Sequence, residues 1–425
     1  MATPDVAVLV PWRSIGESHR ERSWSLVQKQ WASFGYPVYT GDDGGNPFSR
    51  AAAINNAASQ APNADVYIVA DADVLVVREQ VEKAIAMALE GPGYVQPFDT
   101  YIPLDAQDTY WVWQRQAVPH NLAHRPRATW VSVSACQVMS RQTFEAVGGF
   151  DERFRDWGYE DSAFDLRMTR EQAPRRNVAG PAWHLFHPFT VRDTKANVGL
   201  WTEYMDQYQV KIPKILHRVV PEFTTPQVER WWELWCEMHP DWEHRTWRDP
   251  INPEGWETGQ LWSRAVAGAQ IAGYLRLEIL WKYGGVYVDS DLEPVRPIDP
   301  LCNTNRAFAV REDDHCVPDF VLGAPPEHPA IRDCLDRVLS MPHEVMFDPV
   351  KGPWDSGPGV TNAIIAQRED LDCIVYPPVT FCPVHYKQKD QIAAREHIWR
   401  NDPKTYAIHH WHASWKEPQA QEQPA

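Results

Sequence analysis

The sequence predicts an α/β protein with two domains in tandem, each built on a mostly parallel sheet. Three observations support this prediction. Short, continuously apolar segments alternate with helix-like segments, which is typical of parallel strands covered by helices on both faces. The pattern stops at a polar stretch, Val191–Gln209, and begins again at Lys211. The length of 425 residues also exceeds that of one typical domain.

The spacing of apolar residues places the elements of the first half. Continuous apolar runs predict buried strands at Val6–Pro11, Tyr36–Thr40 and Val66–Ala70. Helical spacing predicts helices at Glu21–Phe34, Ser49–Ala61 and Arg78–Leu89. Strands and helices therefore alternate along this half, which favours a largely parallel sheet.

The second half follows the same plan with little direct sequence identity to the first. The predicted strands are Lys211–Val220 and Val286–Val288, and the predicted helices are Gln227–His239 and Gln270–Tyr283. We therefore expect one domain at 1–208 and another at 209–416. The polar tail at 417–425 is rich in proline and glutamine, and we expect it to be disordered.

Composition excludes several classes of protein. The 41 basic and 57 acidic residues give a net charge of −16, which argues against a nucleic-acid partner. The seven cysteines show no CxxC spacing, which indicates reduced thiols. The sequence lacks an apolar run of roughly 20 residues and a secretory signal, so we expect a cytoplasmic protein without an integral membrane segment.

Two predicted strands end on a pair of aspartates one residue apart. Asp71 and Asp73 follow the first in "VYIVADADVLVV", and Asp289 and Asp291 follow the second in "YGGVYVDSDLEP". In an extended chain, side chains two residues apart point the same way, so each pair is expected to face one ligand. Two such carboxylates favour Mg²⁺ or Mn²⁺, which in turn binds phosphate groups. A solvated turn is the alternative for either pair, because the motif is short.

A second acidic pair lies further along the first half, in "VGGFDERFRDWGYEDSAFDLRMTR", Val147–Arg170. Glu160 and Asp161 open a helix there, and Trp157 and Gly158 precede them. Such a carboxylate has two interpretations. It caps the helix N-terminus, or it accepts the proton of a sugar hydroxyl as a general base.

These motifs together resemble the metal-dependent GT-A glycosyltransferases, which have a Rossmann-like sheet. The resemblance rests on "GGFDE-F--WG-ED---LR", the upstream DxD, "VLVPWR" and "FSRAAAINNAA", and it covers nearly all of residues 5–190. It is nearest to the inverting family-2 enzymes and to the C-terminal segment shared by β-1,4-galactosyltransferases.

The resemblance implies a role for each matching residue. Asp71 and Asp73 would hold the metal ion and the donor diphosphate, and Asp161 would be the catalytic base, with Glu160 beside it. His184 would complete the metal site, with His187 as the alternative. The remaining implied donor contacts are Arg13, Arg50 and Trp157.

The second half resembles glycosyltransferase family 32, whose members are similar in being GT-A folded, metal-dependent and retaining. "IPK-IH", "LR-EIL-KYGGVY-D-D-EP" and "H-W--SW" occur in order across residues 211–416. The resemblance makes Asp289 and Asp291 the DxD pair and makes Arg276 a catalytic contact to the donor. Tyr287 would stack or hydrogen-bond near the nucleotide. His410 would complete the metal site, with His409 and His412 as alternatives, while Ser414 and Trp415 would close over the phosphates.

One position departs from the family pattern. Gly273 stands where the family commonly carries an aspartate that holds the donor-sugar hydroxyls, three residues before the helix arginine. Three explanations stay open. The donor differs, another residue replaces the aspartate, or this domain has lost activity. Asp355 or Ser356 in "WDSGPGV" would be a replacement that also contacts the donor.

The leading hypothesis is a bifunctional glycosyltransferase with two metal-dependent sites. Each domain would bind one Mn²⁺ or Mg²⁺ and a UDP- or GDP-sugar, and would transfer the sugar to a glycan or protein acceptor, in sequence onto one growing polysaccharide. A second hypothesis keeps one active domain and makes the other a glycan-binding or scaffolding module. A metal-dependent phosphohydrolase fits the DxD pairs but explains neither "WGYED" nor "YGGVYVDSD". The sequence leaves the sugar, the acceptor and the oligomeric state open.

Overall fold

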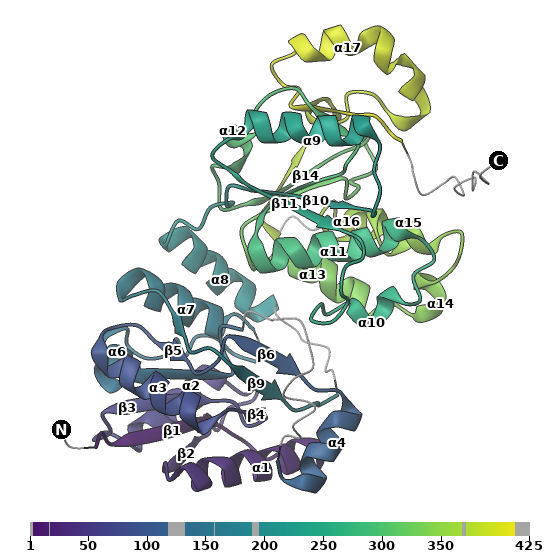
Figure 1. Ribbon diagram of the computed structural model, residues 1–425. Coiled ribbons are helices and arrows are strands. Elements are labelled where there is room, and N and C mark those ends of the chain that lie inside the picture. The colour runs from purple at the N-terminus through teal and green to yellow at the C-terminus, as the bar shows by residue number, and fades with distance from the viewer. Residues whose placement is uncertain are drawn as a thin grey trace. The chain divides into compact units, whose positions relative to one another are not determined.

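The computed structural model divides the chain into two compact units, Met1–Tyr208 and Gln209–Ala425 (Figure 1). It describes residues 3–16, 18–117, 132–156, 158–188, 195–367 and 371–412. The predicted tail at 417–425 lies outside the described residues, as do Trp157, Ser414 and Trp415. Within the described part of the chain, no helix is both long and apolar enough to cross a membrane. All seven cysteines are free.

A six-stranded sheet forms the centre of the first unit, in the order β2-β1-β3-β7-β5-β8. Its strands are β1 (Val6–Pro11), β2 (Val38–Gly41), β3 (Val66–Ala70), β5 (Val95–Gln96), β7 (Cys136–Ser140) and β8 (Arg176–Asn177). A three-stranded sheet joins β4 (Val74–Leu75), β9 (Pro181–His184) and β6 (Thr100–Pro103). The helices are α1 (Ser18–Phe34), α2 (Arg50–Ser59), α3 (Arg78–Glu90), α4 (Ala106–Arg115), α6 (Arg141–Ala146), α7 (Glu160–Glu171) and α8 (Lys195–Gln207).

The second unit has a six-stranded sheet in the order β11-β10-β12-β15-β14-β16. Its strands are β10 (Ile215–Val220), β11 (Glu243–Arg248), β12 (Gly285–Val288), β14 (Ala307–Val310), β15 (Val321–Ala324) and β16 (Cys373–Tyr376). A separate pair joins β13 (Leu292–Pro294) and β17 (Ala407–His409). The helices are α9 (Pro226–Met238), α10 (Gly259–Trp262), α11 (Gly268–Tyr283), α12 (Asp299–Cys302), α13 (Pro329–Leu339), α14 (His343–Met346), α15 (Gly352–Asp355), α16 (Pro358–Ile364) and α17 (Ile392–Asn401).

The two large sheets have the same strand directions. In the first, β1 is parallel to β2 and β3, β7 is antiparallel to both its neighbours, and β5 is parallel to β8. In the second, β10, β15 and β14 take the places of β1, β7 and β5. The predicted α/β class with two mostly parallel sheets is confirmed. The sequence predicts that both halves share the order strand, helix, strand and acidic pair. The sheets show that the similarity between the halves includes all six strands of each.

Apolar cores lie on both faces of each sheet, which explains the continuously apolar strands. In β1, Val6, Val8 and Val10 pack into one core with α1 and α3, while Ala7 and Leu9 pack into another with α2. Alternation sends successive side chains to opposite faces, so a strand covered on both faces has no polar positions. In the second unit, Trp235 of α9 packs on one face, and α11 and α13 cover the other (Figure 1).

Glu278, a residue of α11, holds the segment that leads into α10. Its side chain is buried, and its carboxylate accepts hydrogen bonds from the backbone N–H groups of Glu257, at 2.7 Å, and Thr258, at 2.8 Å, and from the Thr258 hydroxyl. Burial raises the pKa of Glu278 to about 7, although these donors oppose the shift. Glu278 is therefore a structural residue.

The Glu278→Ala variant is expected to lower the free energy of unfolding of the second unit by about 2–4 kcal/mol, because it leaves buried donors without an acceptor and opens a cavity. Chemical denaturation followed by tryptophan fluorescence measures this. Glu254→Ala is the control, because Glu254 is exposed and its loss should change stability by less than about 0.5 kcal/mol. Equal effects of the two substitutions would contradict the structural role of Glu278.

Candidate active sites

Both acidic pairs lie at the carboxyl end of a central strand, where the backbone fixes their position. The N–H of Asp71 donates to the carbonyl of Ala135 at 2.9 Å, and the N–H of Asp289 donates to Phe320 at 2.8 Å. Each acceptor lies beside the antiparallel strand that neighbours the pair, β7 or β15. In open α/β sheets, ligands bind beyond the carboxyl ends of strands, so both pairs lie where a ligand is expected.

In the first unit, Asp73 lies beside two histidines. The pairing of β4 with β9 places Val74 opposite His184. Asp73 Oδ2 lies 3.6 Å from His184 Nε2 and 3.7 Å from His187 Nε2. One ligand atom of each of the three residues lies within 4.8 Å of the others, as a metal site requires. The structure therefore brings together the predicted His184 and its alternative, His187.

Asp71 lies in a different cluster, around Arg50 at the start of α2. Arg50 Nη2 donates to Asp71 Oδ1 at 2.6 Å, and Nη1 donates to Asp161 Oδ1. Glu160 Oε1 lies 3.8 Å from the same Nη1. This differs from the prediction that Asp71 and Asp73 hold one ion together. The reason is that the chain turns at 72–73, so the alternation of an extended strand ends at Asp71.

The two arginines predicted to contact the donor are both paired with acids. Arg13 donates to Asp42, to Asp43 at 2.9 Å, and to the carbonyl of Gly45 at 2.6 Å. It therefore holds the loop before α2. Arg50 is engaged by the carboxylates described above, so it organises the acidic cluster.

The acidic cluster makes Asp161 suitable for proton transfer. Burial, with the charges of Glu160 and Asp71, raises the pKa of Asp161 to about 8, although Arg50 opposes the shift. Glu160 Oε2 accepts a hydrogen bond from the N–H of Gly158 at 3.1 Å, and burial raises the pKa of Glu160 as well. Asp161 thus has a pKa near neutral pH, which suits a general base.

In the second unit, Asp289, Asp291 and His409 offer ligand atoms within 4.8 Å of one another. His409 Nε2 lies 3.1 Å from Asp291 Oδ1. The backbone N–H of His412 donates to Asp291 Oδ2 at 2.8 Å. Although burial works in the opposite direction, His409 lowers the pKa of Asp291, and Asp291 raises that of His409.

The structure places His409, and not the predicted His410, within reach of the acidic pair. His410 Nε2 lies 2.9 Å from Glu293 Oε2, and its ring stacks on Trp231 with the centroids 4.3 Å apart. His409 pairs with Leu292 at the end of β17, next to the acidic pair. Adjacent residues of an extended strand point to opposite sides, so only one of the two histidines can face Asp291.

Arg276 connects Asp289 to a third carboxylate. Its Nη2 lies 3.2 Å from Asp289 Oδ1, and its Nη1 lies 3.3 Å from Asp319 Oδ1. The guanidinium carbon lies 4.4 Å from the ring centroid of Tyr287, whose hydroxyl donates to Asp289 at 2.8 Å. Tyr287 is only 1% exposed, so it supports Asp289 and has no free face for a nucleotide. The sequence did not indicate Asp319.

The two residues proposed to compensate for Gly273 lie in or next to α15. Ser356 is fully buried, and its hydroxyl contacts Gln270 Nε2 at 2.8 Å and the hydroxyl of Tyr274 at 3.3 Å. It is therefore part of the core. Asp355 is half-buried and has no side-chain hydrogen bond within the described residues.

The two sites share one arrangement. The first aspartate of each pair binds a helix arginine, as Asp71 binds Arg50 and Asp289 binds Arg276. The second aspartate of each pair lies beside a histidine at the end of a short antiparallel pair of strands. That histidine is His184 opposite Val74, or His409 opposite Leu292. The strand pairing identifies His184 and His409 as equivalent positions.

Both clusters fit a small divalent cation. Carboxylate oxygens and imidazole nitrogens suit Mn²⁺ well, and Mg²⁺ accepts the oxygens. In the second unit, burial raises the pKa of Asp289 to about 6, with Asp291 and Asp319 adding to the shift and Arg276 opposing it. Carboxylates crowded in this way need a counter-charge beyond one arginine and one histidine.

If the second cluster holds a cation, the His409→Ala variant is expected to lower Mn²⁺ affinity of the second unit by about tenfold or more, because it removes one of the three groups that could bind the ion. His410→Ala is the matched control and should change affinity by less than about threefold, within ordinary context effects. Isothermal titration with Mn²⁺ measures both. A protonated imidazole cannot bind metal, and Asp291 raises the pKa of His409, so affinity should also fall as the pH is lowered. A larger loss of Mn²⁺ affinity in His410→Ala than in His409→Ala would support the predicted His410 as the metal-binding histidine.

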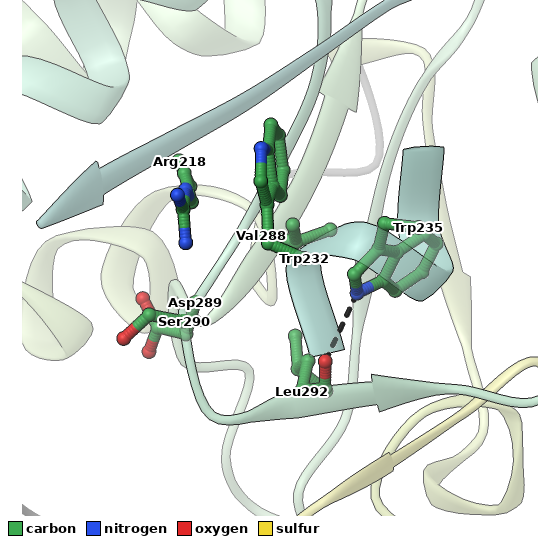
Figure 2. Close-up of a pocket in the computed structure, with 7 residues that line it drawn as sticks. All are labelled: Arg218, Trp232, Trp235, Val288, Asp289, Ser290 and Leu292. Atoms are coloured by element: carbon green, nitrogen blue, oxygen red, sulfur yellow. Dashed lines mark hydrogen bonds between the residues drawn. The ribbon is translucent and has the colours of Figure 1, made fainter. Parts of the chain in front are cut away.

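A small hollow lies beside Asp289 (Figure 2). Its lining residues are Arg218, Trp232, Trp235, Val288, Asp289, Ser290 and Leu292. The Arg218 guanidinium lies 4.7 Å from the Trp232 ring centroid, and Trp235 Nε1 donates to the carbonyl of Leu292 at 2.9 Å. The hollow leaves essentially no enclosed room even for a water molecule, so no nucleotide-sugar fits inside it.

Two family models match the chain, one in each half. A "glycosyltransferase sugar-binding region containing DXD motif" matches residues 226–308, which include Arg276 and the second acidic pair. An "N-terminal domain of galactosyltransferase" matches residues 122–184, which include Glu160, Asp161 and His184.

Curated relatives are also glycosyltransferases. Human α-1,4-N-acetylglucosaminyltransferase is 26% identical over 34% of this chain and 43% of its own length. Inositol phosphoceramide mannosyltransferase 3 of Schizosaccharomyces pombe is 25% identical over 37% of this chain and 45% of its own length. The chain thus spans less than half the length of these relatives.

Solved structures with partial similarity include a Drosophila β-1,4-galactosyltransferase 7 in complex with manganese, UDP-Gal and xylobiose. It is 16% identical, covers 42% of this chain and 65% of its own, and has a TM-score of 0.28. A glycosyltransferase involved in glycosylation of the major capsid of PBCV-1 is 14% identical, covers 46% and 94%, and has a TM-score of 0.30. The two resemblances that the motifs indicated are confirmed by the family models: the first half is similar to galactosyltransferases, and the second half is similar to DXD-containing glycosyltransferases.

Proposed function

We propose that this protein is a bifunctional glycosyltransferase that uses nucleotide-sugar donors and a divalent cation in each half. One observation carries the proposal. The same set of an aspartate pair, a helix arginine and a histidine at the end of a short antiparallel pair of strands occurs at equivalent strand ends in both units. Each set overlaps a segment similar to a different group of glycosyltransferases.

The first unit is proposed to invert the configuration of the transferred sugar. Asp161 accepts the proton of the acceptor hydroxyl at its carboxylate, and Arg50 orients that carboxylate toward Asp71. Asp73, His184 and His187 would hold the divalent cation. The chemistry that a bound cation supplies is neutralisation of the charge on the departing diphosphate.

The second unit is proposed to retain the configuration. Asp289, Asp291 and His409 would hold its cation. Arg276 places a fixed positive charge next to Asp289, and this charge would help to neutralise a bound diphosphate. Tyr287 keeps Asp289 in place through its hydrogen bond. The acceptor is proposed to be a glycan or a protein. Because the two units are joined, the product of one site would be at high effective concentration for the other.

The proposal is tested by incubating the purified chain with Mn²⁺ and a panel of donors: UDP-glucose, UDP-galactose, UDP-N-acetylglucosamine and GDP-mannose. We expect release of UDP or GDP from at least one donor, and complete loss of release in EDTA. Release that persists without a divalent cation would contradict the proposal. Activity in only one unit would favour the alternative, in which the other unit is a glycan-binding or scaffolding module.

A further inference from the structure

Gly273 occupies a position at which the structure itself does not require glycine. It lies inside α11, and a glycine in a helix interior destabilises the helix relative to alanine. Its φ is not in the left-handed region. A Cβ built on it would come no closer than 3.6 Å to Gly357 Cα and 3.8 Å to Asp319 Oδ2, which are ordinary contacts. Neither backbone strain nor packing therefore explains the missing side chain.

Asp319 faces the space beside Gly273 with one unused oxygen. The residue is 6% exposed. Its Oδ1 lies 3.3 Å from Arg276 Nη1, whereas none of the described residues donates a hydrogen bond to Oδ2. That oxygen lies 3.6 Å from a Cβ built on Gly357, so two glycines border it. A carboxylate oxygen that receives no hydrogen bond from the described residues can accept one from a ligand.

The position of this oxygen relative to the metal cluster identifies the part of the ligand that it would meet. Arg276 bridges Asp319 and Asp289, so Oδ2 lies one guanidinium group away from the aspartate pair. In a nucleotide-sugar, the sugar is bonded to the phosphate that the cation would hold. Sugar hydroxyls are hydrogen-bond donors, and glycine at 273 and 357 leaves no side chain between this oxygen and a ligand.

We propose that Asp319 determines which donor sugar the second unit accepts, by receiving hydrogen bonds from sugar hydroxyls that enter the space left by Gly273 and Gly357. The inference rests on the proposed function and names the sugar-binding carboxylate of that site. Asp319 thereby supplies from the segment before β15 the acidic group that is missing from α11 at Gly273.

The Gly273→Ala variant tests the space. A methyl group there is expected to lower kcat/KM for the preferred nucleotide-sugar about tenfold or more, because it competes with the sugar. Affinity for UDP or GDP with Mn²⁺ should stay within about twofold, because these ligands have no sugar at that position. The melting temperature should be unchanged or higher. Gly268→Ala in the same helix is the matched control, since its Cβ would meet nothing within 4 Å, and it should leave all three quantities unchanged.

The Asp319→Asn variant tests the carboxylate. Its amide replaces one acceptor with a donor, so the ratio of kcat/KM between UDP-galactose, UDP-N-acetylglucosamine and GDP-mannose should change about tenfold or more. Binding of UDP or GDP with Mn²⁺ should not change. Unchanged donor ratios in Asp319→Asn, or unchanged kcat/KM in Gly273→Ala, would overturn the inference while the proposed function stands. If the unsubstituted protein binds neither UDP nor GDP with Mn²⁺, the proposed function fails and the inference falls with it.

Discussion

Replacing Asp291 with asparagine is expected to lower sugar transfer by the second unit about a hundredfold or more. Asp291 lies against His409 and accepts a hydrogen bond from the backbone N–H of His412. Asparagine preserves the size of the side chain but removes the charge that holds a cation. Stabilisation of a leaving diphosphate by a cation is worth several kcal/mol, and each 1.4 kcal/mol changes the rate tenfold. Release of UDP or GDP at saturating donor measures the effect.

The same substitution in the first unit separates the two activities. Asp73→Asn is expected to remove a different product from the one that Asp291→Asn removes, because each aspartate belongs to its own cluster. Asp241→Asn is the control, since this exposed aspartate pairs with Lys214 on the surface and should leave both products within about twofold. Mass spectrometry of the glycan products resolves them. If either site variant retains the full set of products, the bifunctional proposal is wrong.

The elements that the sequence predicts best are those with long, one-sided or fully buried patterns. The strands β1, β3 and β12 and the helices α9 and α11 follow from apolar runs and helical spacing. β1 and β3 have the predicted bounds, and the ends of the other three differ by at most two residues. The strands β5 and β8 escape prediction because they have two residues each. So short a strand shows no period, and only its neighbours in the sheet define it.

The candidate sites show the same limit at the level of single residues. The acidic pairs and Arg276 stand next to apolar runs and glycines, which makes them visible in the sequence. The choice between His409 and His410 depends on the register of β17 with β13, which no local pattern reveals. Asp319 lies 43 residues from Arg276, and only folding brings their side chains together. Its one signal is that a charged residue stands just before the apolar run at 320–324, which contains β15.

The Asp161→Asn variant is expected to lower transfer by the first unit by about 10²–10⁴-fold, the usual contribution of a general base. The pH dependence gives a second test. Burial raises the pKa of Asp161 to about 8, so below that pH the group carries a proton and cannot accept one. In the unsubstituted protein, kcat/KM should therefore rise with pH and level off above about 8. In Asp161→Asn, this inflection should disappear from the residual rate.

A carboxylate on the same helix provides the control for this prediction. Asp165 lies one turn further along α7 and accepts a hydrogen bond from the hydroxyl of Tyr94. Asp165→Asn keeps an acceptor there, so we expect a rate within about threefold of the unsubstituted protein and an unchanged inflection. An equal loss of rate in both variants would mean that α7 is disturbed as a whole and that Asp161 has no special role.

The neighbouring Glu160 distinguishes a proton-accepting Asp161 from a structural one. Its charge contributes to the raised pKa of Asp161, so Glu160→Gln should lower that pKa and move the inflection of kcat/KM to lower pH. A purely structural role for Asp161 predicts no such movement, because the rate would then not depend on whether Asp161 is protonated. The decisive measurement is kcat/KM of the first unit from pH 5.5 to 9.5 in both proteins, each held at saturating Mn²⁺. An inflection at the same pH in both would refute Asp161 as the base.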